Sequence, residues 1–207
     1  MVLAFGKAAG RPDAVDKIVF GGMTDRAIAR LGLSEIGAEV DEAGIDAVIS
    51  AYRAFLEEEL PKTERFRVHD GALELVELAH ATGHAVGLGT GNVRDGARLK
   101  LERAGVWHRF DFGGFGCDAE ARDVLLSIGR ARGAERLRCD AQSSETLVIG
   151  DTPRDVHAAH AIGAKCLAVT TGRFDRQQLS DAGADRVVAS LSEPAARAAL
   201  TESFSQI

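Results

Sequence analysis

Residues 147–155 read Leu147-Val148-Ile149-Gly150-Asp151-Thr152-Pro153-Arg154-Asp155. An apolar run bounded by Gly and Pro is typical of a buried parallel strand, and a carboxylate at the carboxyl end of such a strand lies where open α/β sheets hold ligands. Asp155 is expected in the first turn of the following helix, facing the same crevice. Two carboxylates there suit Mg²⁺, which prefers oxygen ligands and often accompanies phosphate. The alternative is purely structural: Asp155 caps a helix behind Pro153, and Asp151 ends a strand.

The composition excludes several classes of protein. The chain has 207 residues, of which 45% are hydrophobic, enough for one core or for one core and a small accessory domain. A net charge of −6, the lack of a basic block and an aromatic content of 5% disfavour nucleic acid as a partner. No run approaches the roughly 20 apolar residues of a membrane span. The odd number of cysteines (Cys117, Cys139 and Cys166) and their spacing argue against disulfides and zinc, so we expect a cytoplasmic protein.

The pattern of hydrophobic residues changes near residue 64. Residues 1–64 show helical periods and no strand-like run, whereas residues 65–207 alternate between strands and helices. We therefore expect a helical domain over 1–64 and an α/β domain over 65–207, with a parallel sheet covered by helices on both faces. The expected strands are 85–89, 110–115 (a short strand or extended loop), 146–149, 166–170 and 186–189; the expected helices are 71–79, 97–104, 123–132, 156–162 and a terminal helix with a loose end within 192–207.

A second motif follows the strand expected at 85–89. Thr90-Gly91-Asn92 places a hydroxyl and two backbone N–H groups between a strand end and a helix start, which favours a phosphate cradle. Alternatively, Thr90 or Asn92 is only the N-cap of the next helix. A rival interpretation treats residues 86–91 as the glycine-rich loop of a nucleotide or S-adenosylmethionine binder. That interpretation needs an acidic residue at the end of the next strand, and Asp111 lies near the right distance but inside an aromatic-glycine stretch.

Together, the two motifs resemble the second and fourth motifs of the haloacid dehalogenase superfamily of phosphohydrolases. Residues 91–102, the aromatic-glycine run through residue 116, and residues 163–164, 169–174 and 182–185 resemble its phosphoglycolate-phosphatase-like branch, and residues 20–25 resemble part of that branch's cap domain. The resemblance covers nearly the whole chain. It implies a Rossmann-like parallel sheet with a helical cap domain.

One motif of that family has no counterpart in these 207 residues. The family's chemistry starts with Asp-x-Asp-Gly-Thr on a first strand, which supplies the nucleophile and lies between the strands that end at Thr90 and Asp151. Without it, we expect two central strands with unpaired inner edges and a chain that is inactive as written. We hypothesise that Met1 is an internal methionine of a longer reading frame, with roughly 20 residues ahead of it.

The resemblance assigns roles to residues of both motifs. It implies that Asp151 is a Mg²⁺ ligand and that Asp155 supports the metal, through water or by orienting its neighbours. It also implies that Thr90 donates a hydrogen bond to the transferring phosphoryl group, beside the N–H groups of Gly91 and Asn92.

The resemblance also implies a cation that neutralises the phosphate and cap residues that face the site. We favour Lys100 over Arg122 as the cation that neutralises the phosphate, and for either residue a solvated helix face is the alternative. Thr24 and Asp25 are expected to face the site from the cap and to bear on substrate choice, unless they form an ordinary N-cap.

The reaction implied by the family is Mg²⁺-dependent hydrolysis of a small phosphorylated metabolite through an aspartyl-phosphate. The alternatives are a non-catalytic relative that binds a phosphate ligand and the S-adenosylmethionine-type binder. The sequence leaves open which phosphomonoester is bound and whether the protein is a monomer or a homodimer.

Overall fold

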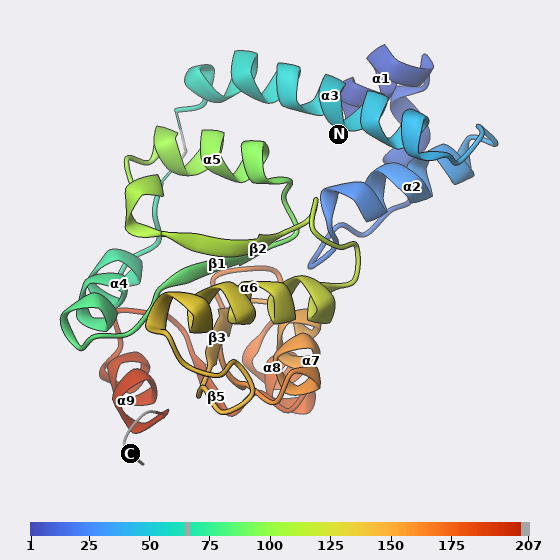
Figure 1. Cartoon of the computed structure of the whole chain (residues 1–207). Helices are drawn as coiled ribbons and strands as arrows, with labels where there is room; N and C mark the ends of the chain where they lie inside the picture. Colours follow the sequence, from blue (N-terminus) through green and yellow to red (C-terminus); the bar gives the residue numbers. More distant parts are fainter. Residues whose placement is uncertain (65–66, 204–207) are drawn as a thin grey trace.

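The computed structural model describes residues 1–64 and 67–203 (Figure 1). Residues 65 and 66, where the α/β domain was expected to start, lie outside the described residues, and so do residues 204–207 of the expected terminal segment. The division into two domains therefore stays a prediction. Below, the helical segment means residues 1–64 and the α/β segment means residues 67–203.

The helical segment contains no strand in its described residues, as predicted. Its elements are α1 (Val2–Ala9), the 3₁₀ turn η1 (Pro12–Val15), α2 (Asp25–Glu35), α3 (Glu42–Glu59) and the 3₁₀ turn η2 (Leu60–Lys62). Side-chain caps start the two longer helices: Thr24 accepts a hydrogen bond from the Ala27 N–H, and Asp41 accepts one from the Gly44 N–H. The segment has its own core, in which Phe5, Ile45 and Val48 are fully buried.

The α/β segment alternates between helices and strands. Each predicted strand and helix of this segment has a counterpart, with ends shifted by a few residues, and one short helix, α8, was not predicted. The elements are α4 (Ala72–Ala81), β1 (Gly87–Thr90), α5 (Arg94–Arg103), η3 (Trp107–Arg109), β2 (Phe112–Phe115), α6 (Arg122–Leu137), β3 (Leu147–Gly150), α7 (Pro153–Ala161), β4 (Lys165–Val169), α8 (Arg176–Asp181), β5 (Arg186–Val188) and α9 (Pro194–Ser203).

The strands form two parallel sheets rather than one. Strand β1 pairs with β2 from Gly87↔Phe112 to Thr90↔Phe115, and the second sheet has the order β3-β4-β5. Among the described residues, β1 and β3 each have a hydrogen-bonded neighbour on one side only, which agrees with the expectation of unpaired edges. Ile149 in β3 is 41% exposed, whereas four of the five residues of β4, which has two neighbours, are buried.

Helix α6 connects the two sheets (Figure 1). It packs against β1, β2 and α7, and its Leu125 is fully buried. Close approach is possible because β2 presents glycine: a Cβ on Gly114 would lie 1.8 Å from the carbonyl oxygen of Leu125. As a result, the start of α6 lies near the carboxyl ends of both β1 and β3. None of the described helices combines the length and the apolar content needed to cross a membrane.

Candidate active site

The loop after β3 is organised by Asp155. This residue is 3% exposed, and its Oδ2 accepts hydrogen bonds from the Asp151 N–H (3.1 Å), the Thr152 N–H (3.0 Å) and the Thr152 hydroxyl (2.8 Å). The Thr152 Oγ1 accepts in turn from the Asp155 N–H, so the two residues form a capping box at the start of α7, with Pro153 in its first turn. Asp155 is therefore in the first turn of the helix, as predicted, and it has the capping role of the structural alternative.

Asp151 is placed differently from Asp155. It follows the last residue of β3 and is half-buried. Burial, reinforced by the nearby negative charge of Asp155, raises the pKa of the Asp151 carboxyl above its usual value, and Arg122 and His69 oppose this rise. The loop after β4 passes against this carboxylate: a Cβ on Gly172 would lie 2.2 Å from its Oδ2. The side chain is thus a confined carboxylate that would gain from a nearby cation.

The loop after β1 is held by a residue of the helical segment. The Thr90 Oγ1 accepts a hydrogen bond from the Asn92 N–H at 3.2 Å. The Asp25 carboxylate accepts from the Val93 N–H (2.9 Å) and from the Asn92 side-chain amide (3.3 Å), and the Asp25 N–H donates to the Gly91 carbonyl (2.7 Å). Neither Thr90 nor Asn92 caps α5, because the N-cap is Val93 and makes no side-chain cap bond. The N-cap interpretation of this loop was therefore wrong.

Thr24 and Asp25 touch the loop rather than an open pocket. Thr24 is 1% exposed, is the N-cap of α2 and donates to the Glu120 carbonyl at 3.3 Å. Asp25 is 5% exposed, and burial raises the pKa of its carboxyl. Their contacts are structural, so the predicted influence on substrate choice has no direct support in this geometry. That Asp25 holds the Gly91–Val93 loop was not anticipated, because no local sequence signal links residues so far apart.

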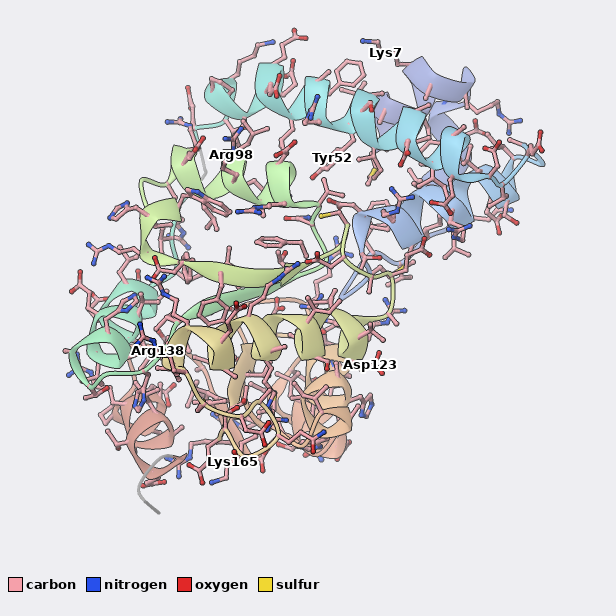
Figure 2. All side chains as sticks on the ribbon, viewed as in Figure 1. Lys7, Tyr52, Arg98, Asp123, Arg138 and Lys165 are labelled. Carbon is pink, nitrogen blue, oxygen red and sulfur yellow. The ribbon has the colours of Figure 1, made fainter. Side chains whose placement is uncertain are left out.

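The two candidate cations occupy different positions. The Arg122 Nε donates to the Asp155 Oδ1 at 2.5 Å, and its guanidinium also reaches the Gly89 carbonyl at 3.5 Å. Lys100 donates to the Asn92 Oδ1 at 2.9 Å, and its ammonium lies 5.8 Å from the centroid of the Tyr52 ring. Figure 2 shows Tyr52 on α3, on the side that faces α5. Arg122 contacts both motif-bearing strand ends, whereas Lys100 contacts only the first, so the geometry favours Arg122 more than the sequence did.

The acidic residues of the site offer few protein ligands to a metal ion. No group of three or more His, Cys, Asp or Glu side chains in residues 1–64 and 67–203 is placed to hold a metal. Both oxygens of Asp155 already accept bonds from protein donors, which leaves Asp151 as the better ligand. Mg²⁺ commonly keeps several waters and binds through one or two carboxylates and phosphate oxygens. The site therefore suits a hydrated Mg²⁺ held with a phosphate ligand, and it does not form a closed protein cage.

The S-adenosylmethionine interpretation fails on strand direction. Asp111 precedes β2, and β2 runs parallel to β1, so this residue lies at the opposite end of the strand pair from Gly91. Its carboxylate pairs with Arg136 at 2.6 Å. The acidic residue that such a site needs beside the glycine-rich loop is therefore not supplied by Asp111.

Comparison with known proteins gives a consistent result. A profile of the family described as haloacid dehalogenase-like hydrolase matches residues 11–160, more than half of the chain, and a second profile of HAD-hydrolase-like proteins matches residues 127–194. A curated relative, "Probable phosphatase IndB" of Dickeya dadantii (strain 3937), is 30% identical over 155 residues, which is 74% of this chain and 66% of that relative.

Solved structures with the same fold are more distant in sequence. A predicted phosphoglycolate phosphatase from Haemophilus somnus 129PT has a TM-score of 0.64 at 14% identity, covering 95% of this chain and 88% of that chain. CbbY from Rhodobacter sphaeroides in complex with phosphate has a TM-score of 0.65 at 14% identity, covering 83% of this chain and 75% of that chain.

Proposed function

We propose that this chain, which belongs to the haloacid dehalogenase-like hydrolase family, binds a small phosphorylated metabolite and Mg²⁺ between the ends of β1 and β3. The proposed site is phosphatase-like, of the phosphoglycolate-phosphatase-like type. The observation that carries the proposal is the position of Arg122, whose guanidinium contacts Asp155 after β3 and Gly89 beside Thr90. A single cation is thus shared by the two motifs, at the place where a phosphate would need neutralising.

The residues present support binding and positioning. Thr90 offers a hydroxyl, and the backbone of Gly91 and Asn92 offers N–H groups, to phosphoryl oxygens. Asp151 would hold the metal, and Asp155 would act as a positioning residue because it fixes both the Asp151 backbone and Arg122. When bound, Mg²⁺ supplies positive charge to the phosphoryl oxygens. The solved structure of CbbY with phosphate supports a phosphate ligand for this fold.

The 207 residues contain no Asp-x-Asp pair, so we propose that the chain binds phosphate without hydrolysing esters. Family members use a carboxylate nucleophile, and none of the residues assigned here replaces it. A non-catalytic relative that binds a phosphate ligand would behave in the same way, whereas an active phosphatase would turn over phosphate esters. We also propose a cytoplasmic location, which the free thiols of all three cysteines support.

Calorimetric titration of the 207-residue chain with inorganic phosphate, with and without MgCl₂, tests this proposal. We expect phosphate to bind more tightly when Mg²⁺ is present. Asp151→Asn should remove the benefit of Mg²⁺, and Thr90→Val should weaken phosphate binding about tenfold, consistent with the loss of a hydrogen bond to a charged group. Asp123→Asn is the matched control, because Asp123 is an exposed carboxylate beside Arg122 (Figure 2).

Two outcomes would contradict the proposal. Phosphate binding that is unchanged in both Thr90→Val and Asp151→Asn would show that the ligand lies elsewhere. Hydrolysis of p-nitrophenyl phosphate by the purified chain, sensitive to Asp151→Asn, would show that this site turns over phosphate esters.

A further inference from the structure

A cavity with both apolar and charged lining residues lies between the helical segment and the start of α5. Its volume is about 210 Å³, and its charged lining consists of Arg26 from α2, Arg53 from α3, and Arg94 and Asp95 from the first turn of α5. Cys117, in the loop after β2, also lines it and is exposed. None of the residues assigned above to phosphate or metal binding is part of this lining.

The charges of the lining are only partly compensated. The charge of Arg26 is compensated by ion pairs with Glu42 and Asp46. Arg53 pairs with Asp95 at 2.9 Å, and both side chains are 50% exposed, so this ion pair contributes little and can be exchanged. Arg94 makes no ion pair with the described residues; its guanidinium lies 5.8 Å from the centroid of the Phe115 ring. The lining therefore carries excess positive charge, centred on Arg94.

We propose that this cavity binds a small oxyanion, the carboxylate or phosphoryl group of a metabolite, with Arg94 as its main partner. A guanidinium presents paired N–H donors that match the two oxygens of such a group. The volume is smaller than that of a site for a drug-sized ligand, which limits the occupant to a few heavy atoms. The proposal does not depend on phosphate binding at Thr90.

Cys117 allows the charge preference of the cavity to be measured directly. Its thiolate displaces iodide from iodoacetate, which is an anion, or from iodoacetamide, which is neutral, to form a thioether. Cys139 is an internal control: it is also exposed, and its neighbours Arg138 (Figure 2) and Asp140 carry opposite charges. The ratio of the two alkylation rates, followed by peptide mass spectrometry, should be about fivefold higher at Cys117 than at Cys139 and should converge in about 1 M salt.

Substitutions in α5 test whether the charge of Arg94, rather than the shape of its side chain, sets the preference for iodoacetate. Arg94→Gln should remove the preference for iodoacetate at Cys117, whereas Arg94→Lys should retain most of it. Arg98→Gln is the matched control, because Arg98 is an exposed arginine of the same helix that pairs with Glu102 outside the cavity (Figure 2). Equal rate ratios at Cys117 and Cys139, or a ratio at Cys117 that is unchanged by Arg94→Gln, would overturn the proposal.

Protection by inorganic phosphate distinguishes this cavity from the loop after β1. Phosphate should slow the alkylation of Cys117 by both reagents and leave Cys139 unaffected. This protection should persist in Thr90→Val and disappear in Arg94→Gln. The opposite pattern, in which protection is lost in Thr90→Val and kept in Arg94→Gln, would mean that phosphate acts from the Thr90 loop, and the proposal would be wrong.

Discussion

The loops after β1 and β3 are each held by a buried aspartate. The two aspartates differ in how far along the chain they lie from the loop that they hold. Asp155 accepts from the N–H groups of Asp151 and Thr152, three to four residues before it, and contacts Arg122. Asp25 accepts from the N–H group of Val93, which is 68 residues away, and its carboxylate forms no ion pair with the described residues. One loop is therefore organised locally, and the other depends on the docking of the helical segment.

This difference has consequences for stability. Loss of Asp155 would disturb a loop, a helix cap and a buried ion pair within the α/β segment. Loss of Asp25 would disturb only the junction between the two segments. Because each segment can stay folded while the junction rearranges, we expect a smaller loss of stability. Four substitutions, taken from the largest expected effect to the smallest, test whether the two loops respond as this comparison implies.

Asp155→Ala should have the largest effect, a loss of about 3 kcal/mol in the free energy of unfolding. The substitution leaves the N–H groups of Asp151 and Thr152 without their acceptor and leaves Arg122, which is 19% exposed, without its partner. Urea unfolding followed by circular dichroism measures the loss. The control is Asp123→Ala, which removes an exposed carboxylate from the first turn of α6 and should change stability by less than about 1 kcal/mol. Equal effects of the two substitutions would contradict the role of Asp155.

Asp25→Ala should cost about 2 kcal/mol, because it leaves the buried Val93 N–H unpaired. The isosteric Asp25→Asn adds a test by pH. Burial raises the pKa of Asp25, so the stability that this carboxyl contributes is complete below its unfolded pKa of about 3.9 and is lost as the pH rises through the folded value. The advantage of the unmodified chain over Asp25→Asn should therefore be greater near pH 4 than near pH 7. A difference that grows as the pH rises would show that the charged form is favoured instead.

Gly91→Ala tests the contact between the loop and the helical segment by steric means. A Cβ at this position would lie 2.3 Å from the carbonyl oxygen of Met23, which belongs to the backbone and cannot move without shifting the start of α2. We expect a loss of about 2 kcal/mol. The control is Gly105→Ala, at a position where nothing lies within 4 Å of the added Cβ but φ is +72°, so its cost comes from backbone strain alone. Limited proteolysis should cut Gly91→Ala between the segments and should leave Gly105→Ala uncut there.

The same contrast explains how much of this molecule could be predicted from its sequence. The strand, turn and helix around Asp151 and Asp155 were predicted correctly because capping boxes and apolar runs are local signals. The unpaired edges of β1 and β3 were anticipated only through the family resemblance, and the separation into two sheets was not anticipated. The apolar composition of β3 resembles that of a fully buried strand, although Ile149 is 41% exposed.

The positions of Asp25 and Arg122 illustrate what sequence alone could not supply. Both residues are located by tertiary packing: Asp25 by the docking of α2 on the loop after β1, and Arg122 by the close approach of α6 to β2. Periodicity placed each residue near a helix start but gave no information on its partners. Lys100 was preferred because it lies in the helix that follows Thr90. Within the Thr90-Gly91-Asn92 motif, however, it hydrogen-bonds to Asn92 alone.

Asp151→Asn should have the smallest effect on stability and the opposite sign. Burial and the charge of Asp155 raise the pKa of Asp151, so the contribution of this carboxyl to stability is complete below its unfolded pKa and is lost as the pH rises through the folded value. Near pH 7 and without Mg²⁺, the neutral amide should leave the chain equally stable or stabilise it by less than about 1 kcal/mol, and this gain should vanish toward pH 4. Urea unfolding at the two pH values measures it. The two carboxylates of this motif would then have opposite effects on stability. Asp155 stabilises the fold, whereas the charged Asp151 destabilises it by an amount that a bound cation would offset. A loss of stability in Asp151→Asn comparable to that in Asp155→Ala would remove this distinction and with it the main reason to assign the metal to Asp151.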